Sequence, residues 1–247
     1  MPTAVLYDIH GNLPALEAVL REVIEAGADR LVVGGDVVPG PMASESLTCL
    51  LRLDLPLDFI HGNGESAVLA SRAGRTPGHL PEPVQRAIRW VGEHLDPEHA
   101  RLMTAWPGTL RRHIDGVGDV LFCHATPHND TDIFTRMTPA ARLLPLFDPL
   151  GVALVVCGHT HMQFDRQVGE TRVVNAGSVG MPFGVTGADW LLLGPAVMPR
   201  HTTYDLANAA ERIRATDYPD AAAFAANYVL QTPSEEEMLS RYSSVGL

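Results

Sequence analysis

The ten residues ALVVCGHTHM (residues 153–162) combine a run of apolar side chains with two histidines placed just beyond its end. A short run of branched apolar residues that stops at a glycine is typical of a fully buried strand in a parallel sheet. His159 and His161 follow Gly158, at the carboxyl end of that strand. Open α/β sheets bind ligands at this edge, so the pair predicts either a binding site or a solvated polar loop.

The composition is ordinary for a soluble globular protein and excludes some partners. Of the 247 residues, 46% are hydrophobic and 19% are charged. The net charge of −11 argues against general binding of nucleic acid or of anionic membranes. A small phosphorylated substrate stays compatible with it, because bound cations reverse the local field. The pattern indicates no particular oligomeric state.

Cysteine use and the N-terminal residues predict a cytoplasmic protein. Cys49, Cys123 and Cys157 form no CxxC pair, which is expected in a reducing compartment. The first residues carry no signal-peptide pattern, and we find no apolar run long enough to span a bilayer.

Strand and helix patterns alternate along the first quarter of the chain. Buried strands are predicted at residues 3–7, 30–36 and 57–63, and amphipathic helices at 13–28 and 44–53, the second with a serine as N-cap. This order predicts a mostly parallel sheet with crossover helices. Residues 66–118 are more helical and rich in proline, and we expect them to form a cap bordering the site.

The second half adds strands and hairpins to what we interpret as one domain over residues 1–247. Strands are predicted at 119–125 and 153–159, hairpins at 163–177 and 189–199, and helices at 206–215 and 221–230. The polar tail from residue 232 is expected to be partly loose.

Side chains that bind metals recur at the ends of five predicted strands. In chain order they are Asp8 and His10, then Asp36, Asn63, His124, and finally His159 and His161. Each alone is explained by a turn, a helix cap or a surface histidine, but together they predict one site at a sheet edge. Seven such ligands suit two divalent ions that share a carboxylate. Nitrogen and oxygen ligands without thiolate fit Mn, Fe, Ni, Co or Zn, and we favour Mn.

The ordered motifs DIHGN, GGDVV, GNGE, CHA and GHTH, followed by NAGSVGMP, resemble those of the calcineurin-like metallophosphoesterase superfamily. Within it, the chain is most similar to the small bacterial phosphodiesterases of the YfcE type. The resemblance covers about the first three quarters of the chain and implies an α/β fold, a four-layer αββα sandwich of two mixed β-sheets flanked by helices. It also implies a ligand set: Asp8, His10 and His161 hold one ion, Asn63, His124 and His159 hold the other, and Asp36 bridges them.

The function implied by this resemblance is hydrolysis of a phosphate ester, a phosphodiester first of all, by attack of a metal-bridging hydroxide. Asn63, Asp36 and His124 would be the catalytic residues, with Asn63 orienting the phosphate. Two alternatives stay open. GDVVPGP resembles the GD-x-V-x-x-G-P pattern of protein and dinucleoside-polyphosphate phosphatases, and some members of this fold are non-catalytic, metal-binding interaction scaffolds.

One position departs from the family pattern, which commonly reads Gly-Asn-His where this chain has Gly-Asn-Gly. Gly64 cannot donate a proton to a leaving group, and we expect it to leave room for a second substituent on the phosphate. His128 is a possible replacement acid, although a solvated loop histidine is the simpler interpretation. In the helical segment, Trp90 and Trp106 could meet a nucleobase or pack in the interior.

Overall fold

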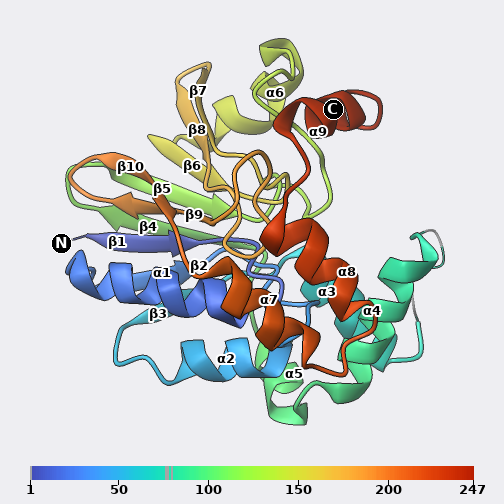
Figure 1. Ribbon diagram of the computed structural model, residues 1–247. Helices are drawn as coiled ribbons and strands as arrows, with labels where there is room; N and C mark the ends of the chain where they lie inside the picture. Colours follow the sequence, from blue (N-terminus) through green and yellow to red (C-terminus); the bar gives the residue numbers. More distant parts are fainter. Residues whose placement is uncertain (1, 76–77, 79) are drawn as a thin grey trace.

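The computed structural model describes residues 2–75, 78 and 80–247 as two five-stranded sheets packed face to face, with helices outside both (Figure 1). In spatial order the first sheet contains β10 (Val197–Thr202), β9 (Ala188–Leu193), β1 (Thr3–Leu6), β2 (Arg30–Val33) and β3 (Leu57–Phe59). The second contains β4 (Thr109–Ile114), β5 (Gly118–Cys123), β6 (Leu154–Cys157), β8 (Thr171–Asn175) and β7 (Phe164–Val168). The predicted sandwich of two mixed sheets is confirmed.

Each sheet has three parallel strands that carry the predicted ligand loops. Strands β1, β2 and β3 run parallel in the first sheet, and β5, β6 and β8 run parallel in the second. Antiparallel strands complete both sheets, through the hairpins β9–β10 and β7–β8 and the pair β4–β5. The loops after β1, β2, β3, β5 and β6 therefore leave the sandwich at the carboxyl ends of parallel strands, where ligand sites of open sheets form.

The central strands are apolar throughout because both of their faces are buried. In β1, Ala4 and Leu6 pack under the outer helices, whereas Val5 and the following Tyr7 point between the sheets. The Tyr7 hydroxyl donates a hydrogen bond of 2.9 Å to the carbonyl of Val156 in the other sheet. A buried phenol with its donor satisfied stabilises the contact between the sheets without leaving an unpaired polar group.

Helices cover both outer faces. The core outside the first sheet includes residues of α1 (Leu13–Glu25), α2 (Ala43–Leu51), α3 (Asn63–Arg72), α4 (Glu82–His94) and α5 (Pro97–Met103), with α4 packed on α3. Helix α6 (Ala140–Phe147), with the turn Asp148–Leu150, covers the second sheet. The C-terminal helices are α7 (Leu206–Arg214), α8 (Ala221–Phe224), the π-helix Ala225–Leu230 and α9 (Glu235–Ser243). Figure 1 shows α7 beside α1 and α8 facing α4.

Three expectations on secondary structure were wrong. Helix α2 begins one residue earlier than predicted, with Met42 as its N-cap and no side-chain capping bond, and Ser44 lies inside its first turn. Residues 109–114 of the expected helical cap form β4, which pairs with β5. The polar tail contains α9, because Ser234 accepts a hydrogen bond from the Glu237 amide and three glutamates occupy the first turn, where the helix dipole favours negative charge.

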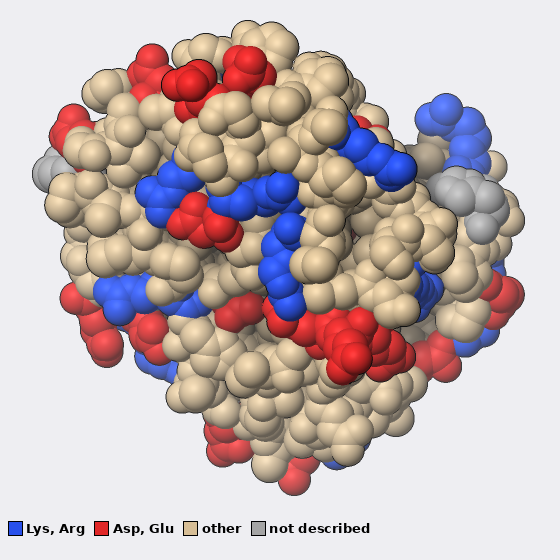
Figure 2. Space-filling view, turned by 90° about the horizontal axis from the view of Figure 1, so that it is seen from above, with Lys and Arg blue, Asp and Glu red and all other residues tan. Residues whose placement is uncertain are grey.

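One face of the molecule carries charges of both signs side by side (Figure 2). On the face in Figure 2, basic and acidic side chains lie interspersed rather than in one large patch of either sign. Within the described part of the chain, no helix is both long and apolar enough to cross a membrane.

An ionic cluster joins the two sheets at one edge. Asp58 on β3 accepts a hydrogen bond of 2.8 Å from Arg30 on β2, and Arg112 on β4 holds both of its carboxylate oxygens, at 2.7 and 3.1 Å. Partial burial opposes the charge of Asp58, but the hydrogen bonds from Arg112 and Arg30 lower its pKa below the usual value. The cluster therefore links strands of different sheets through a bidentate pair.

We predict that Asp58→Asn destabilises the fold at neutral pH by about 1 kcal/mol. Because the folded pKa is lowered, the contribution of Asp58 is present above the unfolded value of about 3.9 and is lost as pH falls through the folded value. Urea unfolding at pH 7, 4 and about 2 measures this difference. Asp54→Asn, at an exposed position of the preceding loop, is the control. A difference that is the same at about pH 2 as at pH 7, or that grows in acid, would contradict the ionic role.

Candidate metal centre

The loops that carry the candidate ligands adopt an unusual backbone conformation. Among the described residues, six non-glycine residues have a positive φ, and five of them are candidate ligands: Asp8 (54°), His10 (48°), Asp36 (53°), His159 (66°) and His161 (57°). Left-handed backbone is costly for residues other than glycine and concentrates at functional sites, where the surrounding structure enforces it. The loops are held by backbone bonds such as that from the His10 amide to the Asp36 carbonyl, at 2.9 Å.

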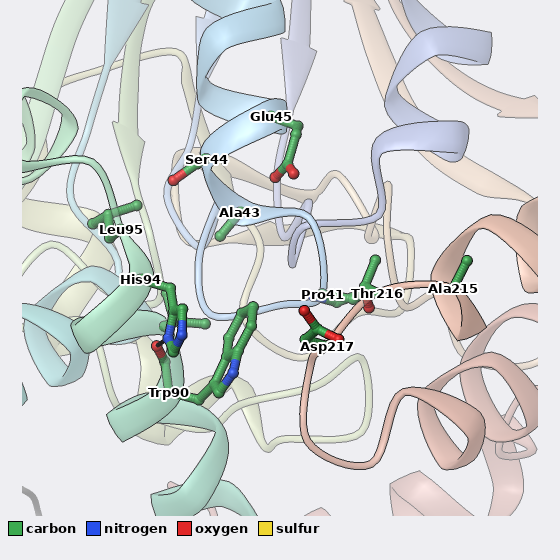
Figure 3. Close-up of a pocket in the computed structure, with 11 residues that line it drawn as sticks. Pro41, Ala43, Ser44, Glu45, Trp90, His94, Leu95, Ala215, Thr216 and Asp217 are labelled. Carbon is green, nitrogen blue, oxygen red and sulfur yellow. Dashed lines mark hydrogen bonds between the residues drawn. The ribbon is translucent and has the colours of Figure 1, made fainter.

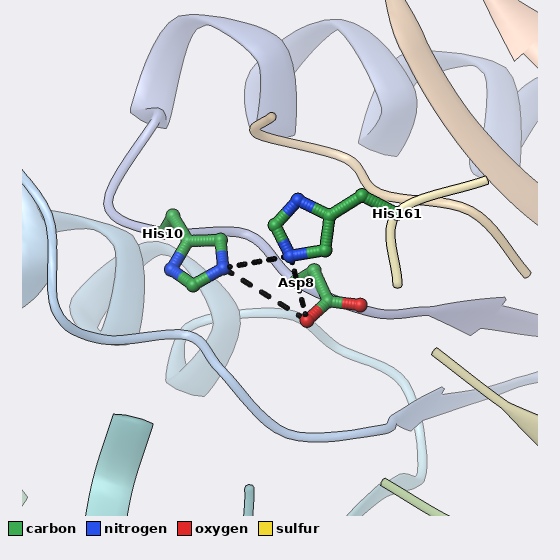
Figure 4. A group of neighbouring side chains, drawn as sticks. All are labelled: Asp8, His10 and His161. Carbon is green, nitrogen blue, oxygen red and sulfur yellow. Dashed lines mark hydrogen bonds and ion pairs between the residues drawn. The ribbon is translucent and has the colours of Figure 1, made fainter. Parts of the chain in front are cut away.

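Asp8, His10 and His161 form the first group of neighbouring donors (Figure 4). Asp8 Oδ1 lies 3.3 Å from His161 Nε2 and 3.8 Å from His10 Nε2, and the two Nε2 atoms are 3.2 Å apart. All three residues are mostly or fully buried. His161 lies 151 positions after His10, yet the three residues place one carboxylate oxygen and two ring nitrogens around a common point.

Asp36 and His124 form a second group together with Asp8. Asp36 Oδ2 lies 3.6 Å from His124 Nε2 and 3.7 Å from His10 Nε2, which places it between the two groups. The other oxygen, Oδ1, accepts a hydrogen bond of 2.6 Å from the Gly64 amide. Asn63 joins through its Oδ1, 3.0 Å from His124 Nε2.

His159 contacts the cluster mainly through its backbone. Its amide donates a hydrogen bond of 2.8 Å to Asp8 Oδ2, and its ring lies 5.2 Å from the ring of His124, edge to face. Burial and then His124 lower the pKa of its imidazole to about 3, so the ring is neutral. All seven predicted residues therefore meet in one place, although the two groups of closely spaced donors contain neither His159 nor Asn63.

Backbone carbonyls fix the orientation of three imidazoles. The Nδ1 atoms of His10, His124 and His161 donate hydrogen bonds to the carbonyls of Pro39 (3.3 Å), Gly34 (3.0 Å) and Met181 (2.8 Å), respectively. A ring that donates from Nδ1 presents the Nε2 lone pair when it is neutral, and metal-binding histidines are usually oriented in this way. In each ring, Nε2 points toward the carboxylates of Asp8 and Asp36.

The donor set fits a bound cation. Asp8 Oδ1 is buried without a hydrogen-bond partner, and unsatisfied buried carboxylate oxygens are costly. The Nε2 atoms of His10 and His161 lie 3.2 Å apart beside this oxygen. Burial opposes a charge on His161, but Asp8 outweighs it and raises the pKa of this imidazole, so the point favours positive charge. Positive charge at this point would satisfy all three atoms at once, and histidine nitrogen with carboxylate oxygen is a donor set that divalent transition metals bind.

Without a cation, the buried charges perturb one another. Burial, then Glu65 and Asp8, raise the pKa of Asp36 to about 8 against the opposing effect of His124. Burial lowers the pKa of His124, but Asp36 and Asp8 outweigh it and raise the value to about 9. The cluster therefore retains protons that a metal would displace.

The family model of the calcineurin-like phosphoesterase superfamily domain matches residues 1–193, which contain all seven candidate ligands. The chain belongs to this superfamily. Its members use divalent metal ions, in agreement with the donor set assembled here.

Individual proteins are similar to this one in sequence or in fold over most of the chain. An uncharacterized protein of Methanocaldococcus jannaschii is 25% identical over 237 residues, which is 88% of this chain and 93% of the relative. The structure of a metallophosphoesterase from Sphaerobacter thermophilus has a TM-score of 0.71 at 25% identity, covering 92% of this chain and 99% of that one. A hypothetical protein from Pyrococcus horikoshii has the same fold, with a TM-score of 0.75 and 21% identity over 94% of this chain and 99% of that one. The YfcE phosphoesterase of E. coli is also similar, with a TM-score of 0.47 and 19% identity over 82% of this chain and 100% of that one.

Glu65 holds the phosphoesterase loops together and was not identified as a site residue from the sequence. Its fully buried carboxylate accepts hydrogen bonds from the amides of Asp36 (2.8 Å), Val37 (2.8 Å), Val38 (3.3 Å) and Gly62 (2.9 Å). It lies in the first turn of α3, where the bond to the Gly62 amide is half of a capping box. The only sequence signal was the acidic residue that ends the GNGE motif.

Gly64 does not leave the space that the sequence suggested. A Cβ at this position would lie 2.0 Å from the Val38 carbonyl oxygen and 2.8 Å from Asp36 Oδ1. The glycine therefore allows the two loops to approach, and its amide donates to Asp36 instead. The expectation that Gly64 accommodates a substituent of the substrate was wrong, since backbone fills that position.

Two further histidines border the cluster. His61 and His128 line a cavity of about 190 Å³ that also includes His124 in its wall. The His61 Nδ1 lies 3.2 Å from the Ser66 hydroxyl, which donates to Asp130 at 2.8 Å, so this ring is held in place. His128, considered from the sequence, thus lies near the cluster, and His61 was missed because it precedes the motif by one residue.

The two tryptophans of the helical segment pack against protein side chains. Trp106 stacks on Phe59, with ring centroids 4.3 Å apart. Trp90 stacks on His94 and borders a separate cavity of about 420 Å³ between α2, α4 and the loop after α7 (Figure 3). None of the seven candidate ligands lines that cavity.

We predict that Glu65→Gln lowers the free energy of unfolding by about 3 kcal/mol, because the amide would turn an NH₂ group toward buried N–H donors. Chemical denaturation of the metal-free protein measures the change. Glu93→Gln, at an exposed position on α4, should shift stability by less than about 0.5 kcal/mol. Equal stabilities for the two variants would show that Glu65 does not hold the loops.

Proposed function

We propose that this protein hydrolyses a small phosphate ester, a diester ahead of a monoester, at a centre of two divalent metal ions. The observation that carries the proposal is the convergence of two carboxylate oxygens, Asp8 Oδ1 and Asp36 Oδ2, with three histidine Nε2 atoms in a buried cluster. The Nδ1 atoms of these three histidines already donate hydrogen bonds to backbone carbonyls, so the Nε2 atoms are the ones that face the carboxylates. Membership in a phosphoesterase superfamily supports it. The net charge of −11 supports a small substrate rather than nucleic acid.

The proposed ligand assignment follows the two groups of donors. Asp8, His10 and His161 would hold one ion, and Asn63, His124 and His159 the other. Asp36 would be shared, which its nearly equal distances to His10 and His124 support. Mn is our first choice among Mn, Fe, Ni, Co and Zn, since the cluster offers nitrogen and oxygen but no thiolate.

When bound, such ions would supply an activated water and neutralise the charge of the phosphate. The chain's own residues would then position the ester. Asn63 directs its Oδ1 toward His124, which leaves its NH₂ group to donate to a phosphate oxygen. The Gly64 amide holds Asp36, and Glu65 fixes the loops behind both, so the donors are preorganised before substrate binds.

Two cavities at the cluster favour a diester. One, of about 190 Å³, includes His124 in its wall, and the other, of about 510 Å³, includes His10. A phosphodiester has two alcohol groups, one for each cavity, while a monoester would leave one of them empty. Turnover of a diester but not of the matching monoester would support this choice.

We predict that Asp36→Asn lowers both the metal content and the turnover of bis(p-nitrophenyl) phosphate, by about 100-fold or more for turnover, because a shared carboxylate serves both ions. Elemental analysis and initial rates in Mn²⁺ are the measurements. His128→Ala is the control and should keep its metal. Undiminished metal in Asp36→Asn would rule out the shared ligand, and full metal without any phosphoesterase turnover in the unmodified protein would favour the scaffold alternative.

We also predict that His61 protonates the leaving group. His61→Gln should slow hydrolysis of a methyl phosphodiester by about 100-fold and that of a p-nitrophenyl diester far less, since a poor leaving group needs the acid. Rates for both substrates, compared with those of His128→Gln, give the answer. Equal losses for the two leaving groups in His61→Gln would assign the acid to another group.

A further inference from the structure

The groove that begins at His10 runs between α4 and the C-terminal helices. Two of its lining residues, Pro39 and Met181, are those whose carbonyls accept the ring N–H groups of His10 and His161. The groove therefore opens directly beside the first group of candidate ligands. At about 510 Å³ it has the size of a small-molecule site.

The walls of the groove are apolar and aromatic. Helix α4 contributes Val84 and Ala87, and the opposite wall includes Phe224 and Tyr228. The rings of Phe224 and Tyr228 lie 5.5 Å apart, and Tyr218 meets Phe224 edge to face at 6.2 Å. Val84 is 42% exposed although it is apolar. A concave apolar surface of this kind beside polar groups is typical of a ligand site.

The charged groups of the groove neutralise one another. Arg86 on α4 and Asp220, the N-cap of α8, form an ion pair across the two walls, and Arg86 also contacts Glu82 at 2.5 Å. Among the described residues that line the groove, the titratable side chains are Arg86, Asp220, His10 and the phenols of Tyr218 and Tyr228. Neither charge is left for a second phosphate or for an ammonium group.

The wall opposite α4 is built outside the segment that defines the superfamily. Residues 218–228 follow the matched residues 1–193. They include Asp220, with a left-handed φ of 63°, and the start of the π-helix Ala225–Leu230, which carries Asn227 and Tyr228 into the groove wall. Such irregular backbone is frequent at functional sites.

We propose that this groove binds an uncharged, apolar alkyl or aryl group of the phosphate ester whose phosphate lies at the cluster. The inference rests on the proposed function and adds the class of substrate: phosphate esters of a hydrophobic alcohol. It disfavours nucleoside polyphosphates, because their additional charges would enter an apolar groove whose one guanidinium is already paired.

Binding of alkylphosphonates to the Mn²⁺-loaded protein tests the groove by calorimetry, without turnover. Methylphosphonate reports on the cluster alone, n-hexylphosphonate adds an apolar chain, and 5-carboxypentylphosphonate adds a chain that ends in a charge. We expect n-hexylphosphonate to bind at least about tenfold more tightly than methylphosphonate, which burial of two methylenes suffices to produce. The carboxylate analogue should show no such gain.

Val84→Asp should reduce the advantage of n-hexylphosphonate to less than about threefold, since it places a charge on the groove wall. Leu51→Asp, at a position that is likewise 42% exposed but lies on α2, should retain the full advantage. If methylphosphonate binds and the longer chain adds nothing, or if Leu51→Asp loses as much as Val84→Asp, the groove is not the site and the proposed function stands. If no phosphonate binds and no phosphate ester is hydrolysed, both proposals fail.

Discussion

The carboxylate of Asp8 is the point at which the two sheets and both groups of candidate ligands meet. It leaves the end of β1 in the first sheet, and its Oδ2 accepts the amide of His159, which follows β6 in the second sheet. Its Oδ1 faces His161, and its own carbonyl accepts the Ser178 hydroxyl at 2.7 Å. Removing this side chain would leave the buried His159 amide unpaired and break the link between the loop after β1 and the loop after β6.

The loops that carry the candidate ligands keep their strained backbone because several hydrogen bonds hold each of them in place. Five candidate ligands have left-handed backbone, which costs about 1 kcal/mol or more for each residue. The bonds from four amides to Glu65, and those from Asn175 to the Gly158 carbonyl and Thr160 hydroxyl, keep the loops in this form. Burial of like charges adds a further cost, visible in the raised pKa of Asp36. A bound cation would offset the cost of the buried charges, while the hydrogen bonds offset the backbone strain.

The strand pattern predicted parallel strands whose carboxyl ends carry the seven candidate ligands. That these strands divide between two sheets was implied by the family resemblance and not by the pattern. The sequence could not predict contacts that depend on how distant loops approach. Glu65 serves amides 27–29 residues away, and Gly64 looked like open space until the Val38 carbonyl filled it. Helix α9 was missed because its few apolar residues give only a weak helical pattern within a polar segment. Its N-terminal signals, Ser234 as N-cap and three glutamates in the first turn, were present in the sequence. The groove could not be predicted from the sequence, because α4 and residues 218–228 come together only in the tertiary fold.

The candidate ligands lie within the segment that matches the superfamily, whereas one wall of the groove lies outside it. Within the matched residues 1–193, His10, His124 and His161 are held by backbone carbonyls, and Asp8 and Asp36 by backbone amides, of other loops, so a substitution there disturbs more than one loop. The groove instead joins α4 to the C-terminal helices through side-chain contacts, among them one exposed ion pair, Arg86 with Asp220. Exposed pairs contribute little to stability, and partly exposed apolar residues such as Val84 can change at small cost. The walls of the groove can therefore change at little cost to the fold while the cluster stays fixed. If the proposed function holds, this is the physical condition under which the same cluster could act on esters of different alcohols.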